Sequence, residues 1–117
     1  MDKKALREER RKYPRAILDL PVEYRVMNVP FEHGGLVVNA SEMGLLINSV
    51  KDLLVGSKLN IAVLFPKGFQ LTNFEASAEV IWKDYHQEEE WEGYRYGLKF
   101  TEILEEDRRK LKHLLSS

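Results

Sequence analysis

Apolar and polar residues alternate with a period of two over much of this 117-residue chain. Between positions 18 and 26, every second residue is apolar or aromatic, and most of the residues between them are polar. Such alternation predicts a strand with one buried face. Alternating segments or short apolar runs occupy residues 18–26, 36–38, 45–47, 59–65, 74–82 and 94–100. Six short strands at this spacing predict a small antiparallel β-barrel.

The end of the chain has the pattern of a helix instead. Over about residues 103–115, four leucines fall on one side: Leu104, Leu111, Leu114 and Leu115. Acidic residues at positions 105–107 precede basic residues at positions 108–110 and 112, an order that complements the helix dipole. We expect this helix to cap one opening of the barrel or to lie across its wall.

Turn-forming residues mark the connections between the predicted strands. Loops are predicted at residues 28–35 and 66–68 and over the acidic stretch 84–92, and a tight hairpin-like turn at residues 39–44. Four aromatic residues on the predicted strands are expected in the barrel core: Trp82, Tyr94, Tyr96 and Phe100.

Composition is typical of a single globular domain, because 117 residues with an apolar share of 44% can bury one core. The sequence contains no cysteine, which excludes disulfides and thiolate metal sites. No apolar run reaches the roughly 18–20 residues that cross a bilayer, and the N-terminal stretch lacks the apolar core of a signal peptide. We therefore expect a cytoplasmic protein without membrane insertion.

Charge is divided unevenly along the chain. Residues 1–15 hold seven basic and three acidic side chains, a balance of +4, and the whole chain carries −1, so the remaining residues carry −5. We expect residues 1–15 to form a flexible basic arm and residues 16–117 to form a single barrel domain. An anionic partner would meet the arm first.

Within the arm, Arg11 and Arg15 form an Arg-x-x-x-Arg motif. Pro14 disfavours a helix at this point, so the motif is expected on a loop that can curl around an anion. The planar guanidinium group bonds phosphate and the O6/N7 edge of guanine in a bidentate way. A basic run near a terminus is also typical of a solvated tail, so this motif alone leaves both interpretations open.

A second motif, Asn-x-Ser-x-x-Gly, begins at Asn39 and ends at Gly44. Asn39 and Ser41 offer the mixture of donors and acceptors that a guanine edge requires. Gly44 permits an unusual backbone conformation or the close approach of a ligand. Asn and Ser in turns also bond their own backbone, so this motif too has a purely structural interpretation.

Together, in this order and with a strand-like segment between them, the two motifs resemble the PilZ domain, a bacterial receptor for cyclic di-GMP. The resemblance covers about residues 7–115. It implies a mainly β fold, a six-stranded antiparallel PilZ-type barrel with a basic N-terminal arm and a C-terminal helix. Cyclic di-GMP would lie on the outside of the barrel, with Arg11 and Arg15 holding phosphate and guanine. Asn39 and Ser41 would contact the other guanine, and Gly44 would shape the turn.

The arm offers two more candidate ligand-binding residues, Arg10 and Arg7, and Arg10 could stack on a second ligand molecule. The resemblance implies a receptor or adaptor whose arm becomes ordered when the dinucleotide binds and which then signals to an unknown protein partner. Beyond this ligand we expect no cofactor.

Three other functions compete with the receptor interpretation. An enzyme is disfavoured because no nucleophile has a paired base, and His33, His86 and His113 lack metal-ligand spacing, so no catalytic or metal site is expected. A small barrel that binds DNA or RNA would use a similar basic arm, but the body beyond the arm is mildly acidic. A PilZ-like barrel that acts only as a ligand-independent protein adaptor remains open.

Overall fold

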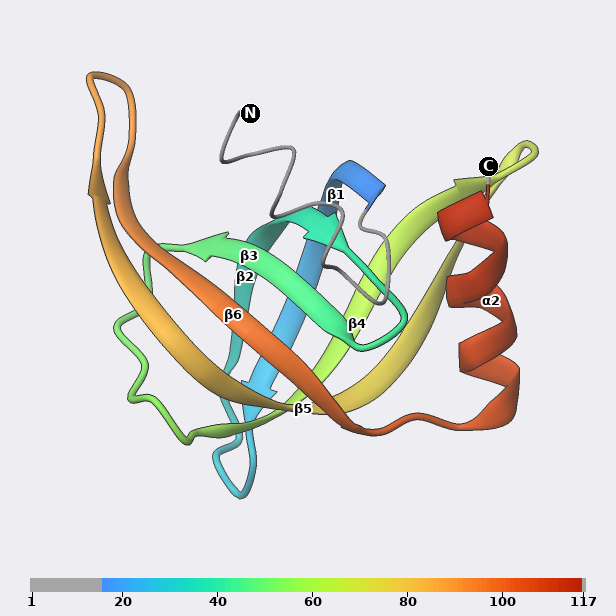
Figure 1. Ribbon diagram of the computed structural model, residues 1–117, viewed down its shortest axis with the longest axis horizontal. Helices are drawn as coiled ribbons and strands as arrows, with labels where there is room; N and C mark the ends of the chain where they lie inside the picture. Colours follow the sequence, from blue (N-terminus) through green and yellow to red (C-terminus); the bar gives the residue numbers. More distant parts are fainter. Residues whose placement is uncertain (1–15, 117) are drawn as a thin grey trace, which may run out of the picture.

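The computed structural model describes residues 16–116, and its architecture is shown in Figure 1. The strands are β1 (Ala16–Val26), β2 (Glu32–Ala40), β3 (Gly44–Ser49), β4 (Lys58–Lys67), β5 (Gln70–Gln87) and β6 (Glu92–Glu102), and they are followed by the helix α2 (Glu105–Ser116). Every pairing is antiparallel, and the strands close into a barrel in the order β1-β2-β3-β6-β5-β4. The predicted six-stranded antiparallel barrel with a terminal helix is confirmed.

Side chains of one face of each strand fill the barrel, as the period of two requires. The largest fully buried side chains are Tyr24, Tyr96, Phe74, Leu45, Ile47, Leu59, Leu111, Val22, Val37, Val63 and Val80. All six strands and α2 contribute to this single core. The opposite faces of the strands form the outer wall of the barrel.

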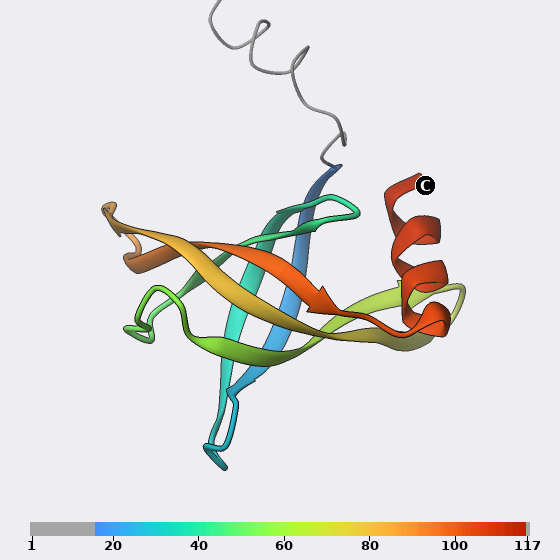
Figure 2. The same cartoon turned by 60° about the horizontal axis from the view of Figure 1, so that its bottom comes forward.

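The helix α2 packs on β5, beside the hairpin that joins β4 and β5 (Figures 1 and 2). Leu111 is fully buried in the barrel core, and Leu114 and Leu115 pack partly against it. Asp107 accepts a hydrogen bond from the backbone N–H of Glu75 at 2.9 Å, which fixes the first turn of the helix to β5. The helix therefore lies across the wall and also closes part of the core.

Leu104 departs from the predicted apolar side of this helix. It precedes the first residue of α2, and 66% of it is exposed. Acidic side chains begin the helix at Glu105, so the leucine falls in the connection after β6. The periodicity was correct for the three later leucines and wrong for this one.

The predicted loop at residues 28–35 is too long. The chain turns at Asn28, which has a positive φ of 67°, and β2 already begins at Glu32. Gly34 and Gly35 suggested a loop, but both pair with β1 inside the sheet. A Cβ atom at Gly35 would lie 2.7 Å from the carbonyl oxygen of Asn48, so that glycine allows the close approach of β3.

The other two predicted loops are also shorter in the structure. Pro66 and Lys67 still belong to β4, and the turn comes at Gly68, where φ is +63°. β5 continues to Gln87 and β6 begins at Glu92, so only residues 88–91 of the acidic stretch lie outside the strands. This part of the β5–β6 hairpin projects beyond the barrel (Figure 1), and no alternation of apolar residues marks it.

Trp82 does not lie in the core, contrary to the sequence prediction, because 40% of it is exposed. The register of β5 against β6 shifts between Val80 and Trp82, and this bulge turns the tryptophan to the outer wall. Its ring covers Gly97, where a Cβ atom would lie only 2.1 Å from the indole nitrogen. Tyr94, Tyr96 and Phe100 pack in or against the core as predicted.

Two buried tyrosines form hydrogen bonds at one end of the barrel, which we call its polar end. The Tyr96 hydroxyl donates to the carbonyl oxygen of Lys51 at 2.5 Å and accepts from the N–H of Leu53 at 2.8 Å. The hydroxyls of Tyr24 and Ser49 are 2.6 Å apart. Burial raises the pKa of both phenols, so they stay protonated and keep these bonds across the neutral range.

Candidate ligand-binding site

The turn between β2 and β3 lies where β1 enters the barrel. Ala16, the first residue of β1, pairs with Ala40, and Ile17 pairs with Asn39. The described chain therefore starts directly beside the second motif. The four candidate arginines, Arg7, Arg10, Arg11 and Arg15, lie outside the described residues.

Asn39 belongs to β2 and not to the turn in which it was predicted. The register of β2 against β3 shifts between Val37 and Asn39, so one extra residue bulges here. Val37 and Ala40 are buried on either side of the bulge, and Asn39 pairs with Leu46 on the outer wall. A β-bulge re-aims side chains, and here it brings a half-buried asparagine to the wall beside the turn.

Ser41 shapes the turn itself and is only 5% exposed. Its side-chain oxygen accepts a hydrogen bond from the N–H of Met43 at 3.1 Å, and its own N–H donates to the carbonyl oxygen of Gly44 at 3.0 Å. The structural interpretation of this serine is thus realised. Because a hydroxyl is also a donor, a ligand contact through its hydrogen is compatible with this geometry.

Gly44 is required by strand packing. A Cβ atom at this position would lie 1.9 Å from the carbonyl oxygen of Leu98 on β6. Only Asn28, Gly56 and Gly68 have positive φ among the described residues, so Gly44 does not need a left-handed conformation. The glycine lets β3 and β6 approach each other at the end of the wall that carries Asn39.

The outer wall next to the turn contains residues that the sequence interpretation did not single out. Gly44, Leu46 and Asn48 of β3 pair with Lys99, Gly97 and Arg95 of β6, in that order. Arg95 donates from Nε to the side-chain oxygen of Asn48 at 2.9 Å. Alternation along β6 could have indicated that Arg95, Gly97 and Lys99 share this wall. The bulge that moves Trp82 onto the same wall has no signal in the sequence.

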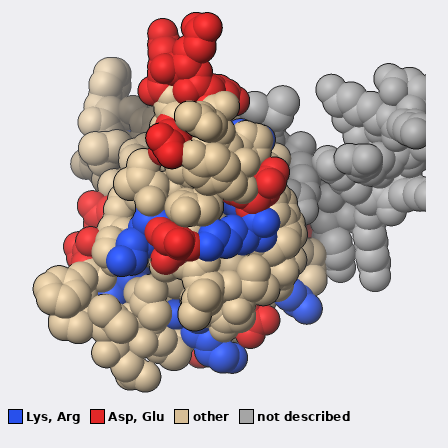
Figure 3. All heavy atoms as spheres, turned by 90° about the vertical axis from the view of Figure 1, so that its left-hand side faces the viewer, with Lys and Arg blue, Asp and Glu red and all other residues tan. Residues whose placement is uncertain are grey.

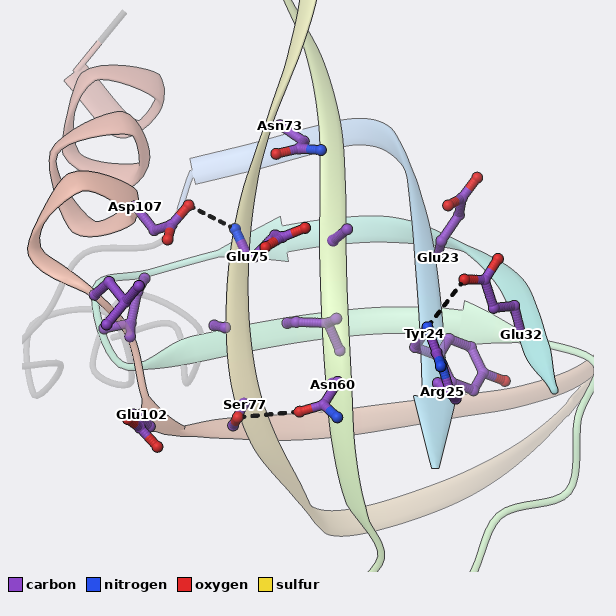
Figure 4. Close-up of a pocket in the computed structure, with 15 residues that line it drawn as sticks. Glu23, Tyr24, Arg25, Glu32, Asn60, Asn73, Glu75, Ser77, Glu102 and Asp107 are labelled. Atoms are coloured by element: carbon purple, nitrogen blue, oxygen red, sulfur yellow. Dashed lines mark hydrogen bonds and ion pairs between the residues drawn. The ribbon is translucent and has the colours of Figure 1, made fainter. Parts of the chain in front are cut away.

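A groove on another part of the surface has the wrong charge for a phosphate ligand (Figure 4). It has a volume of about 470 Å³ and lies between the outer wall of β1, β4 and β5 and the start of α2. Its charged lining consists of Glu23, Glu32, Glu75, Glu102, Asp107 and Arg25. Arg25 already pairs with Glu32 at 3.3 Å, so the uncompensated carboxylates would repel an anion.

The described residues offer neither a metal site nor a membrane span. No group of three or more potential metal ligands occurs among residues 16–116. No helix within this range is long and apolar enough to cross a bilayer.

Several solved structures share this fold. MotI (DgrA), the inhibitor of motility from Bacillus subtilis, superimposes with a TM-score of 0.72 at 22% identity, over 92% of this chain and 49% of that chain. The PilZ domain of YcgR from Escherichia coli, solved with c-di-GMP, gives 0.71 at 15% identity over 92% and 89%. MrkH of K. pneumonia, a transcription regulatory factor that depends on c-di-GMP, gives 0.72 at 16% identity over 92% and 50%.

The chain thus spans about half the length of the MotI and MrkH chains and most of the YcgR domain. Comparison with curated proteins gives no sequence match. The PilZ domain, however, matches residues 9–117, nearly the whole chain. The barrel, its terminal helix and this match lead to one conclusion: the chain belongs to the PilZ domain family.

Proposed function

We propose that this protein is a receptor for cyclic di-GMP that binds the dinucleotide on the outer wall beside the β2–β3 turn. Arg11 and Arg15 hold phosphate and guanine, Asn39 and Ser41 contact the other guanine, and Gly44 keeps the turn against β6. Arg10 and Arg7 add positive charge to the same arm. No catalytic residue and no further cofactor belong to this proposal.

The observation that carries the proposal is the pairing of Ala16 with Ala40. Arg15 is bonded covalently to Ala16, so the sequence connects the arginine motif to the strand end that lies beside Asn39 and Ser41. Chain connectivity thus ties two motifs that lie far apart in the sequence to the same end of the outer wall, which supports a shared site. Consecutive Cα atoms are about 3.8 Å apart, which keeps Arg15 close to this end.

Ligand binding orders the arm in this account. Residues 1–15 carry a balance of +4 and few apolar residues, so an anionic ligand supplies the interaction that holds them against the wall. The ordered arm offers a new surface to a protein partner. A protein without cysteine is suited to a reducing compartment, and we place this receptor in the cytoplasm.

Two other functions of the same barrel make different predictions. A nucleic-acid module would bind polymers of any sequence with an affinity that falls steeply with salt, and the balance of −5 outside the arm disfavours it. An adaptor that has lost the ligand would bind its protein partner equally well with and without cyclic di-GMP. The outward position of Asn39 beside the start of β1 favours the receptor over both.

Calorimetric titration of the full chain with cyclic di-GMP and with cyclic di-AMP tests the proposal. We expect saturable binding that prefers cyclic di-GMP. Because a hydrogen bond to a charged group contributes roughly 1.5–3 kcal/mol, Arg15→Ala should weaken binding by about ten- to a hundredfold.

Arg109→Ala is the matched control, because Arg109 is exposed on α2 and pairs with Glu105 at 3.6 Å. It removes the same charge from a residue of another element, outside both motifs, and should leave the affinity unchanged. A folded chain that gives no heat with micromolar cyclic di-GMP would refute the proposal. Equal losses in the two variants would point to unspecific attraction by charge.

A further inference from the structure

The strand β5 is longer than its neighbour β4. β4 pairs with β5 only as far as Glu79. The backbone of Val80 is hydrogen-bonded to Gly56 and Ser57, which lie in the loop before β4. Beyond this point, β5 pairs with β6 alone until Gln87. Figures 1 and 2 show this part of the β5–β6 hairpin projecting from the barrel. We call residues 83–87 the free β5 edge.

Alternation of the hydrogen bonds identifies the backbone groups at this edge. Glu88 and Trp91 exchange two backbone hydrogen bonds, of 2.7 and 3.4 Å, and so form a hydrogen-bonded pair. Such pairs alternate with non-bonded pairs along an antiparallel ladder, and the register does not shift between Trp82 and Gln87. Lys83, Tyr85 and Gln87 therefore direct their N–H and C=O groups away from β6.

No backbone hydrogen bond from elsewhere in residues 16–116 reaches these outward groups. Exposed sheet edges are commonly protected by a projecting lysine, but Lys83 does not project. Its ammonium group pairs with Asp52 and lies 4.5 Å from the centre of the Tyr94 ring. Tyr85, in the middle of the edge, is 51% exposed. The edge can therefore accept another strand.

The charge around the free β5 edge determines which strand fits. Residues 81–92 contain five acidic side chains and one lysine, and acidic side chains gather at the projecting tip in Figure 3. A second copy of this chain would bring the same negative charge to the contact, whereas a basic strand would be attracted. We propose that a basic, extended segment of a partner protein binds the free β5 edge as an added strand.

This inference does not depend on dinucleotide binding, because the edge and the β2–β3 turn involve different residues. Titration of the full chain with the peptide acetyl-Lys-Val-Lys-Thr-Lys-Val-Lys-amide, followed by NMR, tests it. We expect the amide signals of Lys83, Tyr85 and Gln87 to shift and their hydrogen exchange to slow, and the signals of Ala40 and Ser41 to stay unchanged. Absence of any change at the edge with millimolar peptide would overturn the proposal.

Two altered peptides separate backbone pairing from charge. Methylation of the peptide nitrogens at alternate residues removes the donors of one edge, and exchange of every lysine for glutamate reverses the charge. We expect both to bind more weakly by about tenfold or more. Equal binding of the methylated and unmodified peptides would overturn strand addition, whether or not any protein variant folds.

Tyr85→Pro tests the protein side of the contact. Proline is tolerated where the lost N–H points off a sheet edge, so the β5–β6 ladder should persist while peptide binding falls by about tenfold. Tyr85→Val keeps the donor and should still bind the peptide. Full binding by a folded Tyr85→Pro variant would contradict the proposal. Sedimentation that shows a dimer lost on Tyr85→Pro would also contradict it, since a second copy would then occupy the edge.

Discussion

Single residues of the Asn-x-Ser-x-x-Gly motif serve the fold as well as the proposed site. Ser41 closes the turn through the N–H of Met43, and Gly44 makes room for the carbonyl oxygen of Leu98. Asn39 reaches the outer wall because a bulge precedes it. The motif therefore combines a backbone requirement with a set of polar groups, and the two contributions can be separated by substitution.

Gly44→Ala should destabilise the fold strongly. The added Cβ atom would lie 1.9 Å from the oxygen of Leu98, and overpacking of this kind typically costs about 1–3 kcal/mol. Urea unfolding measures the loss. Gly34→Ala is the matched control, because nothing lies within 4 Å of a Cβ atom there. Equal stability of the two variants would show that β3 and β6 do not approach so closely.

Tyr96→Phe should destabilise the polar end of the barrel. The variant leaves the N–H of Leu53 and the carbonyl oxygen of Lys51 without their partner, and a buried group left unsatisfied costs about 1–3 kcal/mol. Tyr85→Phe removes a hydroxyl that bonds Glu92 on the exposed hairpin. In thermal unfolding, we expect a clear loss for the first variant and little change for the second; similar losses would be inconsistent with a buried network.

For single residues, alternation predicts which face of a strand is buried, but it fails where a bulge shifts the register. Tyr96 was assigned to the core from alternation alone, because one face of a strand is buried. Trp82 was assigned to the wrong face, since one extra residue in β5 reverses the alternation and leaves no signal in the sequence. Asn39 and Ser41 were proposed as candidates because of their motif, whereas Arg95 and Asn48 of the same wall belong to no motif, and alternation could indicate only the face on which they lie.

Among the elements, the helix α2 and the β5–β6 hairpin show where sequence patterns succeed and fail. The helix was predicted to within a few residues because its charge order and its leucines agree. The hairpin was predicted as an acidic loop, although its residues pair as far as Gln87 and Glu92. A hairpin that projects into solvent needs no buried face, so its pairing has no hydrophobic pattern.

Leu111→Ala should show how far α2 contributes to stability. Leu111 is fully buried in the barrel core, and removal of such a leucine typically costs about 2–5 kcal/mol. Leu104→Ala changes an exposed leucine next to the same helix and should cost little. Denaturant unfolding of the two variants provides the comparison, and a small loss for both would mean that the helix is not part of the core.

The pair of Asp52 and Lys83 should make the loop between β3 and β4 sensitive to acid. The hydrogen bond from Lys83 lowers the pKa of Asp52 below its usual 3.8, and the same bond raises the pKa of Lys83 above 10.5. The stabilisation is therefore present above pH 3.8 and is lost as the pH falls through the lower, folded value. It is lost again in base, as the pH rises through the raised value of Lys83.

Unfolding free energies of the wild type and of Asp52→Asn, measured from acid to base, test this expectation. The difference between them should stay constant from weakly acidic to weakly basic conditions and close in strong acid and in strong base. A difference that persists in strong acid would show that the asparagine perturbs something other than the ion pair.

For the whole molecule, the fold and the division of charge follow from different features of the sequence. The six-stranded barrel was predictable because one face of nearly every strand is buried, so the pattern is repeated along the chain. The closure of the ring and the meeting of β1 with the β2–β3 turn depend on contacts between distant segments, which periodicity does not contain. Figure 3 shows acidic groups concentrated at the hairpin tip of a protein whose first 15 residues carry most of the clustered positive charge.

The central claim is that cyclic di-GMP binds between the arm and the β2–β3 turn, and amide hydrogen exchange of the full chain with and without this compound tests it most directly. The account predicts slower exchange in residues 1–15 and at Ala40 and Ser41, with no change at the tip of the β5–β6 hairpin. Exchange that stays the same in the arm and turn at saturating ligand, or slows only along the acidic groove, would contradict it.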